Sequence, residues 1–243
     1  MRATATVALA AALLLLAPCA QAQYSPLSRW SGAATRIGRV APTVGGGWPA
    51  AFAEVDFGIN DILGLGLRAG YLYGSPHAGL RIVEGALIEV PARLRLLERG
   101  AVELSLEATA GLAIGTDRGI ATLDEALAPE LTPLAPGLAV ALVGSWRIGA
   151  GFCLKFGVEV PVTVVLDMTE PPYQDVLELT ASIDPILGFS WTATPWLSVF
   201  LVAQAGPALA WVPVSFTADG YEHEVRIEPH LRGTAGVAFT PWP

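Results

Sequence analysis

The sequence contains few charged residues and almost no lysine. Only 15% of its 243 residues are Asp, Glu, Lys or Arg, against about 25% in a typical soluble domain, which argues against an ordinary cytosolic enzyme. Lys155 is the single lysine and the net charge is −8, so the chain has no basic tail or patch for nucleic acid. The 26 glycines and 19 prolines exclude a helical membrane bundle or a coiled coil.

The first residues have the pattern of a secretory signal peptide. Arg2 is followed by the apolar run 7–17 and then by the small-x-small sequence Ala20-Gln21-Ala22. The apolar run is shorter than the about 20 residues that a membrane-spanning helix needs. We therefore expect residues 1–22 to be a signal peptide that directs export, and residues 23–34 to be an N-terminal periplasmic segment.

Cysteine is equally scarce. The two cysteines are Cys19, in the predicted signal peptide, and Cys153. Cys19 follows an apolar run, as in lipoprotein signals, but Pro18 stands where such signals have a small residue. Signal cleavage would remove Cys19, so the exported chain would have no internal disulfide and its fold must be stabilised in another way.

Long stretches of the remaining chain alternate between apolar and polar residues. Between Val102 and Ile114 the even positions are apolar, while the odd positions include Glu103, Ser105 and Glu107. This is the period of a β-strand and not of a helix. The uncharged segment 185–218 is interrupted by four prolines, so it predicts no membrane-spanning helix. The same alternation recurs in the segments 63–73, 152–166, 177–191 and 225–239.

The class of protein depends on which face of these strands is inside. A soluble barrel buries its apolar face, whereas a membrane barrel turns that face to lipid and encloses the polar one. The polar face here is rich in Gly, Ser, Thr and Ala and carries charges of both signs, which suits a crowded lumen. The strands run about 10–16 residues, and a tilted strand needs about 9–11 to cross a bilayer. We predict an all-β fold, an antiparallel up-and-down transmembrane β-barrel.

The connections between the alternating segments predict the number of strands. Four tight turns alternate with five longer links, which gives about ten strands with both termini on the short-turn side; eight or twelve strands are the alternatives. The first strand is predicted around Arg36–Val44. The tight turns are predicted at Asn60-Asp61, Glu98–Gly100, Gly149–Gly151 and Ala193–Pro195, and the longer links at Gly45–Pro49, Gly74–Ala78, Thr116–Pro136, Met168–Asp175 and Val214–Glu222.

The pattern resembles the small bacterial outer-membrane β-barrel family, that is, the OmpA/OmpX-like and porin-like barrels. The resemblance covers residues 35–241 and is one of pattern, without a shared motif. It implies a barrel domain of residues 35–243 in the outer membrane of a Gram-negative cell, with aromatic girdles at both interfaces. The outer girdle would contain Tyr71, Tyr73 and Trp211, and the periplasmic girdle Trp146, Phe152, Phe189, Trp191 and Phe239.

The mixed charges of the polar face predict an ion-pair network in the lumen. Such a network would occlude a ten-stranded barrel, because side chains fill barrels of about eight strands and open pores appear at about 16–18. Glu89 lies on the same face. The predicted members are Glu54, Asp56, Arg68, Arg93, Arg95, Glu103, Glu107, Arg147, Lys155, Glu159, Glu178, Asp184, Arg226, Glu228, His230 and Arg232.

The longest predicted link, residues 116–136, is acidic and rich in leucine. Thr122 and Glu125 form a capping-box pattern that predicts one helical turn. Exposed leucines usually need a cover, so we expect this loop to contact other envelope proteins, with a solvated lid as the alternative. The expected contact residues are Leu123, Asp124, Glu125, Leu127 and Glu130.

The sequence contains no recognisable cofactor, metal or catalytic motif. Ser75 and His77 form a conceivable Ser–His pair in a rim loop, but no acid is in place to orient the histidine. His223 lies among acidic residues, yet the spacing matches no defined metal site. We therefore predict no catalytic residue, no metal and no cofactor, and a protein that is not an enzyme.

These observations predict a structural or anchoring subunit of a cell-envelope assembly. Its partners would be outer-membrane lipid and, through the 116–136 loop, other envelope proteins. The alternative function is a narrow passive channel for small solutes, and the third is a hydrolase at the barrel rim.

Overall fold

The computed structural model describes residues 40–74, 85–115, 133–149, 151–167, 176–194, 196–217 and 220–239, which form one antiparallel sheet. The predicted signal peptide, the segment 23–34 and the five predicted contact residues of the loop lie outside the described residues. No helix among the described residues is long and apolar enough to cross a membrane. The strands are β1 (Val40–Trp48), β2 (Ala50–Gly58), β3 (Leu63–Leu72), β4 (Gly85–Arg99), β5 (Val102–Gly115), β6 (Pro133–Arg147), β7 (Phe152–Asp167), β8 (Val176–Ser182), β9 (Asp184–Thr194), β10 (Leu197–Thr217) and β11 (Gly220–Phe239).

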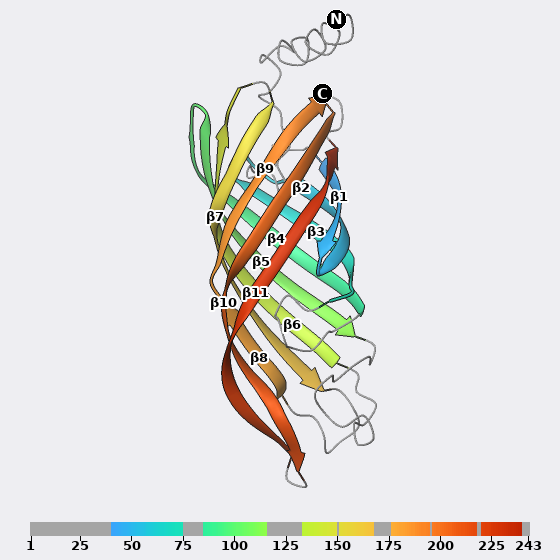
Figure 1. The fold of residues 1–243 in the computed structure, drawn as a ribbon. Coiled ribbons are helices and arrows are strands. Elements are labelled where there is room, and N and C mark those ends of the chain that lie inside the picture. Colours follow the sequence, from blue (N-terminus) through green and yellow to red (C-terminus); the bar gives the residue numbers. More distant parts are fainter. Residues whose placement is uncertain are drawn as a thin grey trace, which may run out of the picture.

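The sheet closes on itself, because β1 pairs with both β2 and β11. The segments β8 and β9 occupy a single position in the wall, since both lie between β7 and β10 and only Ile183 separates them. The 11 segments therefore make a closed up-and-down barrel of ten strands (Figure 1). The predicted all-β barrel and its strand number are confirmed.

Four short turns join strands at one end of the barrel, where β1 begins and β11 ends. In the first turn, the side-chain oxygen of Asn60 accepts hydrogen bonds from the backbone N–H groups of Ile62 and Leu63 at 2.9 and 2.8 Å. Gly100 and Gly149 have φ angles of 60° and 57° in two of the other turns, a conformation that favours glycine. We call this end the short-turn end and the opposite end the loop end.

The predicted link Gly45–Pro49 is wrong, because these residues belong to the wall. β1, described as Val40–Trp48, continues past the predicted end at Val44, and a single proline separates it from β2. Residues 36–39 of the predicted first strand lie outside the described residues. A Cβ atom on Gly47 would lie 1.9 Å from the carbonyl oxygen of Gly233 on β11. The glycine run therefore marks a close approach of two strands and not a loop.

Two other predicted links are shorter than expected. β6 begins at Pro133, so Pro133–Pro136 is strand. β10 and β11 stay paired as far as Thr217 and Gly220, so most of the predicted link Val214–Glu222 is also strand. β1 pairs with β11 only from Gly233 onward. The part of β11 before Gly233 therefore forms a long hairpin with β10, and this hairpin projects past the rest of the barrel (Figure 1).

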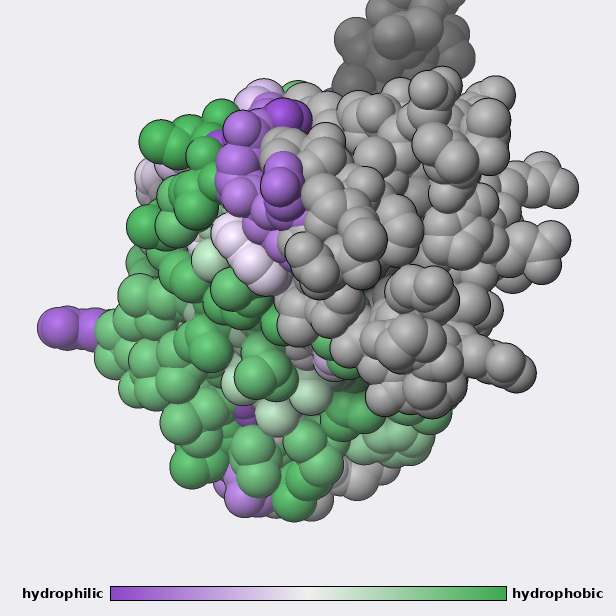
Figure 2. Space-filling view, turned by 90° about the horizontal axis from the view of Figure 1, so that it is seen from below, coloured by the Kyte–Doolittle hydropathy of each residue, from purple (hydrophilic) through white to green (hydrophobic). Residues whose placement is uncertain are grey.

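The exterior of the barrel is apolar and its interior is polar. Leu138, Leu187 and Ile227 are 66, 64 and 77% exposed, whereas Glu107 and Glu159 are 2% and 0% exposed. Figure 2, seen from the loop end, shows hydrophobic residues along the visible sides of the described barrel. Soluble proteins rarely expose apolar patches larger than a few hundred Å², so this exterior is the reverse of a soluble barrel's.

Aromatic side chains are exposed near both ends. Tyr71 and Tyr73 are exposed near the loop end, as predicted. Trp48 joins them there and packs edge-on against Tyr73, with the ring centroids 6.3 Å apart. Near the short-turn end, Phe152 stacks on Trp191 at 6.0 Å. The other exposed aromatic residues at that end include Trp146, Phe189 and Phe239.

Candidate functional site in the barrel lumen

The inward faces of β2 to β5 carry a cluster of charged side chains, which we call the charged wall. Strand alternation turns these side chains inward together, because each lies in phase with the others across the paired strands. All except the half-buried Glu89 are buried. The charged wall consists of Glu54 and Asp56 on β2, Arg68 on β3, Glu89 and Arg93 on β4, and Glu107 on β5.

Arg68 holds two carboxylates of the charged wall. Its Nε donates to Glu54 Oε2 at 2.7 Å, and its Nη1 donates to Glu89. The guanidinium carbon also lies 4.9 Å from the centroid of the Phe52 ring, within the range of a cation–π contact. Arg68 therefore links three strands of the wall.

Arg93 holds the remaining carboxylates. Its Nε lies 3.0 Å from Glu107 Oε2 and its Nη1 lies 3.2 Å from Asp56 Oδ1. Its Nη2 lies 3.4 Å from Glu54 Oε1, so Glu54 joins the two arginines into one network. Removing either partner of such a buried ion pair should destabilise the fold, because the remaining charge is buried without a counter-charge.

Gly66 allows this network to cross a strand. Arg93 on β4 and Asp56 on β2 are separated by β3, where Gly64 lies opposite Arg93 and Gly66 lies opposite Asp56. A Cβ atom on Gly66 would lie 2.8 Å from Asp56 Oδ1 and 2.8 Å from the Cγ of Pro91. The absence of a side chain thus leaves the space in which the two charged groups meet.

The opposite wall, from β6 to β10, carries most of the buried hydrophobic cluster, and we call it the apolar wall, although Lys155, Glu159, Glu178 and Asp184 also face inward from it. Phe52 of β2 packs into the same buried cluster, so this ring crosses the lumen and joins the two walls. The cluster consists of Phe52, Ala141, Val143, Ile186, Phe200 and Val202.

Lys155 lies within the apolar wall on β7. It is 1% exposed, and its ammonium nitrogen lies 5.6 Å from the centroid of the Phe200 ring, a cation–π arrangement. Its Nζ has no hydrogen-bond partner among the described residues. A side chain that faces the lumen and remains this buried shows that no water channel passes it at this level.

Ser182, Asp184 and His230 form a second polar cluster. His230 Nδ1 lies 2.5 Å from Asp184 Oδ2 and 3.3 Å from the Ser182 hydroxyl, which donates to Asp184 at 2.9 Å. β10 runs between His230 on β11 and the other two residues on β8 and β9. Its Gly206 leaves space for the contact, because a Cβ there would lie 2.9 Å from Asp184 Oδ1. The serine and the aspartate share one ring nitrogen of the histidine, whereas a hydrolytic triad places them on opposite nitrogens.

Glu159 and Arg232 lie beside this cluster. Gln204 of β10 donates to the buried carboxylate of Glu159, and Arg232 Nη1 lies 3.7 Å from the same oxygen. Arg232 is half-buried and reaches into the open part of the lumen.

The structure places three predicted network members at the rim of the short-turn end. Arg95 Nη1 pairs with Glu98 at 2.6 Å and its Nε lies 3.5 Å from Glu103. Arg147 lies 3.6 Å from Glu98 and donates to the carbonyl of Gly100 at 3.0 Å. Arg95, Glu103 and Arg147 are therefore not part of the charged wall.

Two other predicted members lie on the projecting hairpin. Arg226 is exposed and pairs with Glu224, so the structure does not bring it into the lumen network. Glu228, which pairs with Ala208 of β10, is half-buried beside it. His223 stacks on Trp211 with ring centroids 3.6 Å apart. Ser75 and His77 lie outside the described residues.

Sequence reasoning missed the uncharged members of the lumen. Phe52 precedes Glu54 and Asp56 by whole periods of two, so its phase could have placed it inside. Gln204 is a lone amide in an otherwise apolar strand, which is a comparable signal. Phe200 has the same phase as Ser198 and Gln204, which is a weaker signal because neither of those residues is charged.

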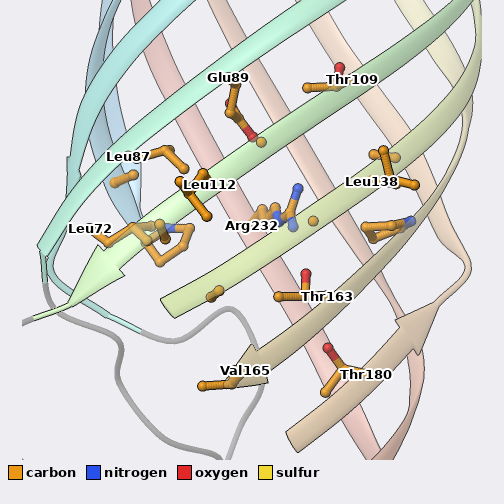
Figure 3. Close-up of a pocket in the computed structure, with 18 of the residues that line it drawn as sticks. Leu72, Leu87, Glu89, Thr109, Leu112, Leu138, Thr163, Val165, Thr180 and Arg232 are labelled. Atoms are coloured by element: carbon orange, nitrogen blue, oxygen red, sulfur yellow. The ribbon is translucent and has the colours of Figure 1, made fainter. Parts of the chain in front are cut away.

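Near the loop end the lumen contains a partly open cavity of about 180 Å³ (Figure 3). Its charged lining residues are Glu89, Glu159, Glu178 and Arg232. In Figure 3 the side chain of Glu89 points toward that of Arg232, with Thr163 and Thr180 on one side and Leu72 and Leu87 on the other. The remaining inward lining is mostly small or apolar and includes Phe52, Ala113, Ala135, Pro161 and Val165.

Among the described residues, no group of three or more His, Cys, Asp or Glu side chains is placed to hold a metal ion. Cys153 is buried and forms no disulfide. The acids of the lumen are thus arranged toward arginines and toward the cavity, and not around a common point.

No protein-family model matches the chain, and no curated protein is significantly similar to it. Solved structures similar to the barrel include the outer membrane protease OmpT from Escherichia coli, which is 11% identical over 84% of this chain and 97% of that chain, with a TM-score of 0.40. The closed ten-stranded sheet supports the predicted resemblance at the level of a β-barrel, and no family match bears on the OmpA/OmpX-like assignment.

This similarity corrects one prediction. The chain was expected not to be an enzyme, and that expectation is contradicted because the similar barrel is a protease. The correction removes the exclusion of catalysis; it assigns no activity, substrate or catalytic residue to this chain.

Proposed function

We propose that the protein is an integral outer-membrane β-barrel with a closed lumen, which serves as a structural or anchoring subunit of the cell envelope. The apolar exterior between two aromatic ends supports insertion into a bilayer. Short turns at one end, and three longer connections at the other (β3–β4, β5–β6 and β7–β8), support the usual orientation, with the short turns in the periplasm.

The observation that carries the closed lumen is the burial of side chains from both walls at one level. Arg68 and Arg93 on one side and Lys155 and Phe200 on the other all face inward and are at most 4% exposed. Side chains that line a water-filled channel are wet, so a continuous channel would expose them. Phe52 fills the space between the walls.

A barrel with a closed lumen can contact partners through its outer surface and loops, but it cannot pass solutes. The closed lumen therefore favours the anchoring role over the passive channel. In this proposal the loop 116–136 contacts another envelope protein through Leu123 and Leu127, while outer-membrane lipid surrounds the wall. The leucines of that loop support a covered surface, because exposed leucines in a loop are unfavourable in water.

Conductance in planar lipid bilayers tests the closed lumen. We expect no steady unitary current from the refolded barrel, and steady open levels would establish the channel instead. Slower gel migration after boiling and recovery in the outer-membrane fraction test the membrane assignment. A photo-crosslinking residue at Leu127 tests the anchoring role, with Leu138 on the lipid-facing wall as the matched control position. A discrete protein adduct from position 127 and none from position 138 is expected.

A further inference from the structure

The proposed anchoring function involves the outer wall and one loop, and it does not account for the cavity at the loop end. This cavity has about 180 Å³ of space, close to the about 150 Å³ of an engineered apolar cavity that binds benzene, and below the about 300–1,000 Å³ of drug-sized sites. A ligand of this cavity is therefore small, with a body about the size of one aromatic ring or a short alkyl chain.

The inward lining of the cavity favours an apolar body. Leu72, Leu87 and Val165 contribute large apolar surfaces, and Ala113 and Ala135 leave room between them. Small-molecule sites commonly combine such walls with a few polar groups that fix the orientation of the ligand. The walls here provide the apolar part of that arrangement.

The charged lining favours a cation. Three carboxylates, those of Glu89, Glu159 and Glu178, line the cavity with one guanidinium, that of Arg232. The excess continues below the cavity, since the four acids of the charged wall share only two arginines, Arg68 and Arg93. In a medium of low dielectric constant this surplus of negative charge attracts a cation more strongly than it would in water.

The arrangement of the carboxylates favours an organic cation over a metal ion. No three acidic, histidine or cysteine side chains among the described residues are grouped for coordination. Glu89 comes from β4, Glu159 from β7 and Glu178 from β8, so they surround an apolar space and do not converge on a point. A protonated amine carried on an apolar body matches both the distributed charge and the walls.

We propose that this cavity binds a small organic cation, with a protonated amine beside the carboxylates of Glu89 and Glu178 and an apolar body against Leu72 and Leu87. The proposal goes beyond anchoring and does not depend on it, because binding requires only the loop-end half of the lumen.

Equilibrium dialysis of three ring-bearing probes against the barrel in phosphatidylcholine nanodiscs tests the proposal at pH 7. Benzylamine is the cation, benzyl alcohol the neutral analogue and benzoate the anion; empty nanodiscs correct for partition into lipid. We expect saturable binding of one benzylamine per barrel and at least tenfold weaker binding of the other two. Equal binding of benzyl alcohol would overturn the cation selectivity, and no saturable binding above the empty discs would overturn the site.

Two variants of β5 locate the binding. Ala113→Leu fills the cavity from inside, whereas Ala110→Leu adds the same atoms to the outward face of the same strand. Ala113→Leu should abolish saturable benzylamine binding and Ala110→Leu should keep it. Ala135→Leu on β6 replaces Ala113→Leu if gel mobility shows that the latter does not fold.

The variant Glu178→Gln tests the charge. It keeps the size of the side chain and should weaken benzylamine binding at least fivefold while leaving the weak binding of benzyl alcohol unchanged. Unchanged benzylamine binding in both the filled and the Gln variants would place the ligand elsewhere and overturn the proposal.

Discussion

The charged wall (β2–β5) and the apolar wall (β6–β10) of the lumen are built from the same alternating strands but are filled in different ways. On the charged wall, long side chains reach across strands to partners, as Arg93 reaches Asp56 over Gly66. On the apolar wall, rings and branched side chains pack by contact, as Phe200, Ile186 and Val202 do. Alternation thus decides which residues face inward, while the charge of those residues, and the space that a glycine leaves between them, decide whether they form ion pairs or pack.

The largest expected effect is the loss of an arginine from the charged wall. Arg93→Met keeps most of the side-chain volume but leaves Glu54, Asp56 and Glu107 facing one another without this counter-charge. We expect the free energy of unfolding to fall by about 3–5 kcal/mol, as when one partner of a buried pair is removed. Urea unfolding in lipid vesicles, followed by tryptophan fluorescence, measures it.

A matched control and a compensating variant sharpen this result. Arg226→Met removes an exposed arginine of the hairpin and should change stability by less than about 1 kcal/mol. Neutralising the three carboxylates in the Arg93→Met background should recover much of the loss, because replacing a whole buried network is often nearly neutral. If Arg93→Met and Arg226→Met had equal effects, the charged wall would not be a stabilising network.

The apolar wall should respond less strongly. Ile186→Ala removes methyl and methylene groups from a buried cluster without stranding a charge. We expect a loss of about 2–4 kcal/mol, in the range for buried Ile→Ala changes, and about 0.5–1.5 kcal/mol for Ile186→Val. The same urea titration measures both. A loss for Ile186→Ala no larger than that for Ile186→Val would show that this part of the lumen is loosely packed.

The fold was predictable because a barrel wall has a strict period of two. Leu104 and Val160 face out and Glu107 faces in, as their phase in the sequence predicts. Phase alone does not decide whether a residue lies in a strand or in a loop when its type is common in both. Gly45–Gly47 was assigned to a link because glycines mark loops, yet here they allow close contact between strands.

The membership of the lumen network was predictable in part. Glu54, Asp56, Arg68, Arg93 and Glu107 come together as the polar face indicates. Their partners could not be predicted, because the pair between Arg93 and Asp56 skips a strand and depends on a glycine between them. The positions of Arg226 and Arg147 depend on where each strand leaves the barrel, which alternation does not encode.

The smallest expected effect compares two inward glycines, one on each wall. A Cβ on Gly66 would lie 2.8 Å from atoms of Asp56 and Pro91, whereas a Cβ on Gly137 of β6 would meet nothing closer than 3.5 Å. Neither glycine has a positive φ angle, so backbone strain does not separate them. Gly66→Ala should therefore cost about 1–3 kcal/mol through overpacking, while Gly137→Ala should be neutral or stabilise by about 0.4–1 kcal/mol through the unfolded chain. Urea titration of both variants in the same vesicles measures the difference. Equal stabilities would mean that the charged wall has room to shift, and that the contact between Arg93 and Asp56 does not depend on the space that Gly66 leaves.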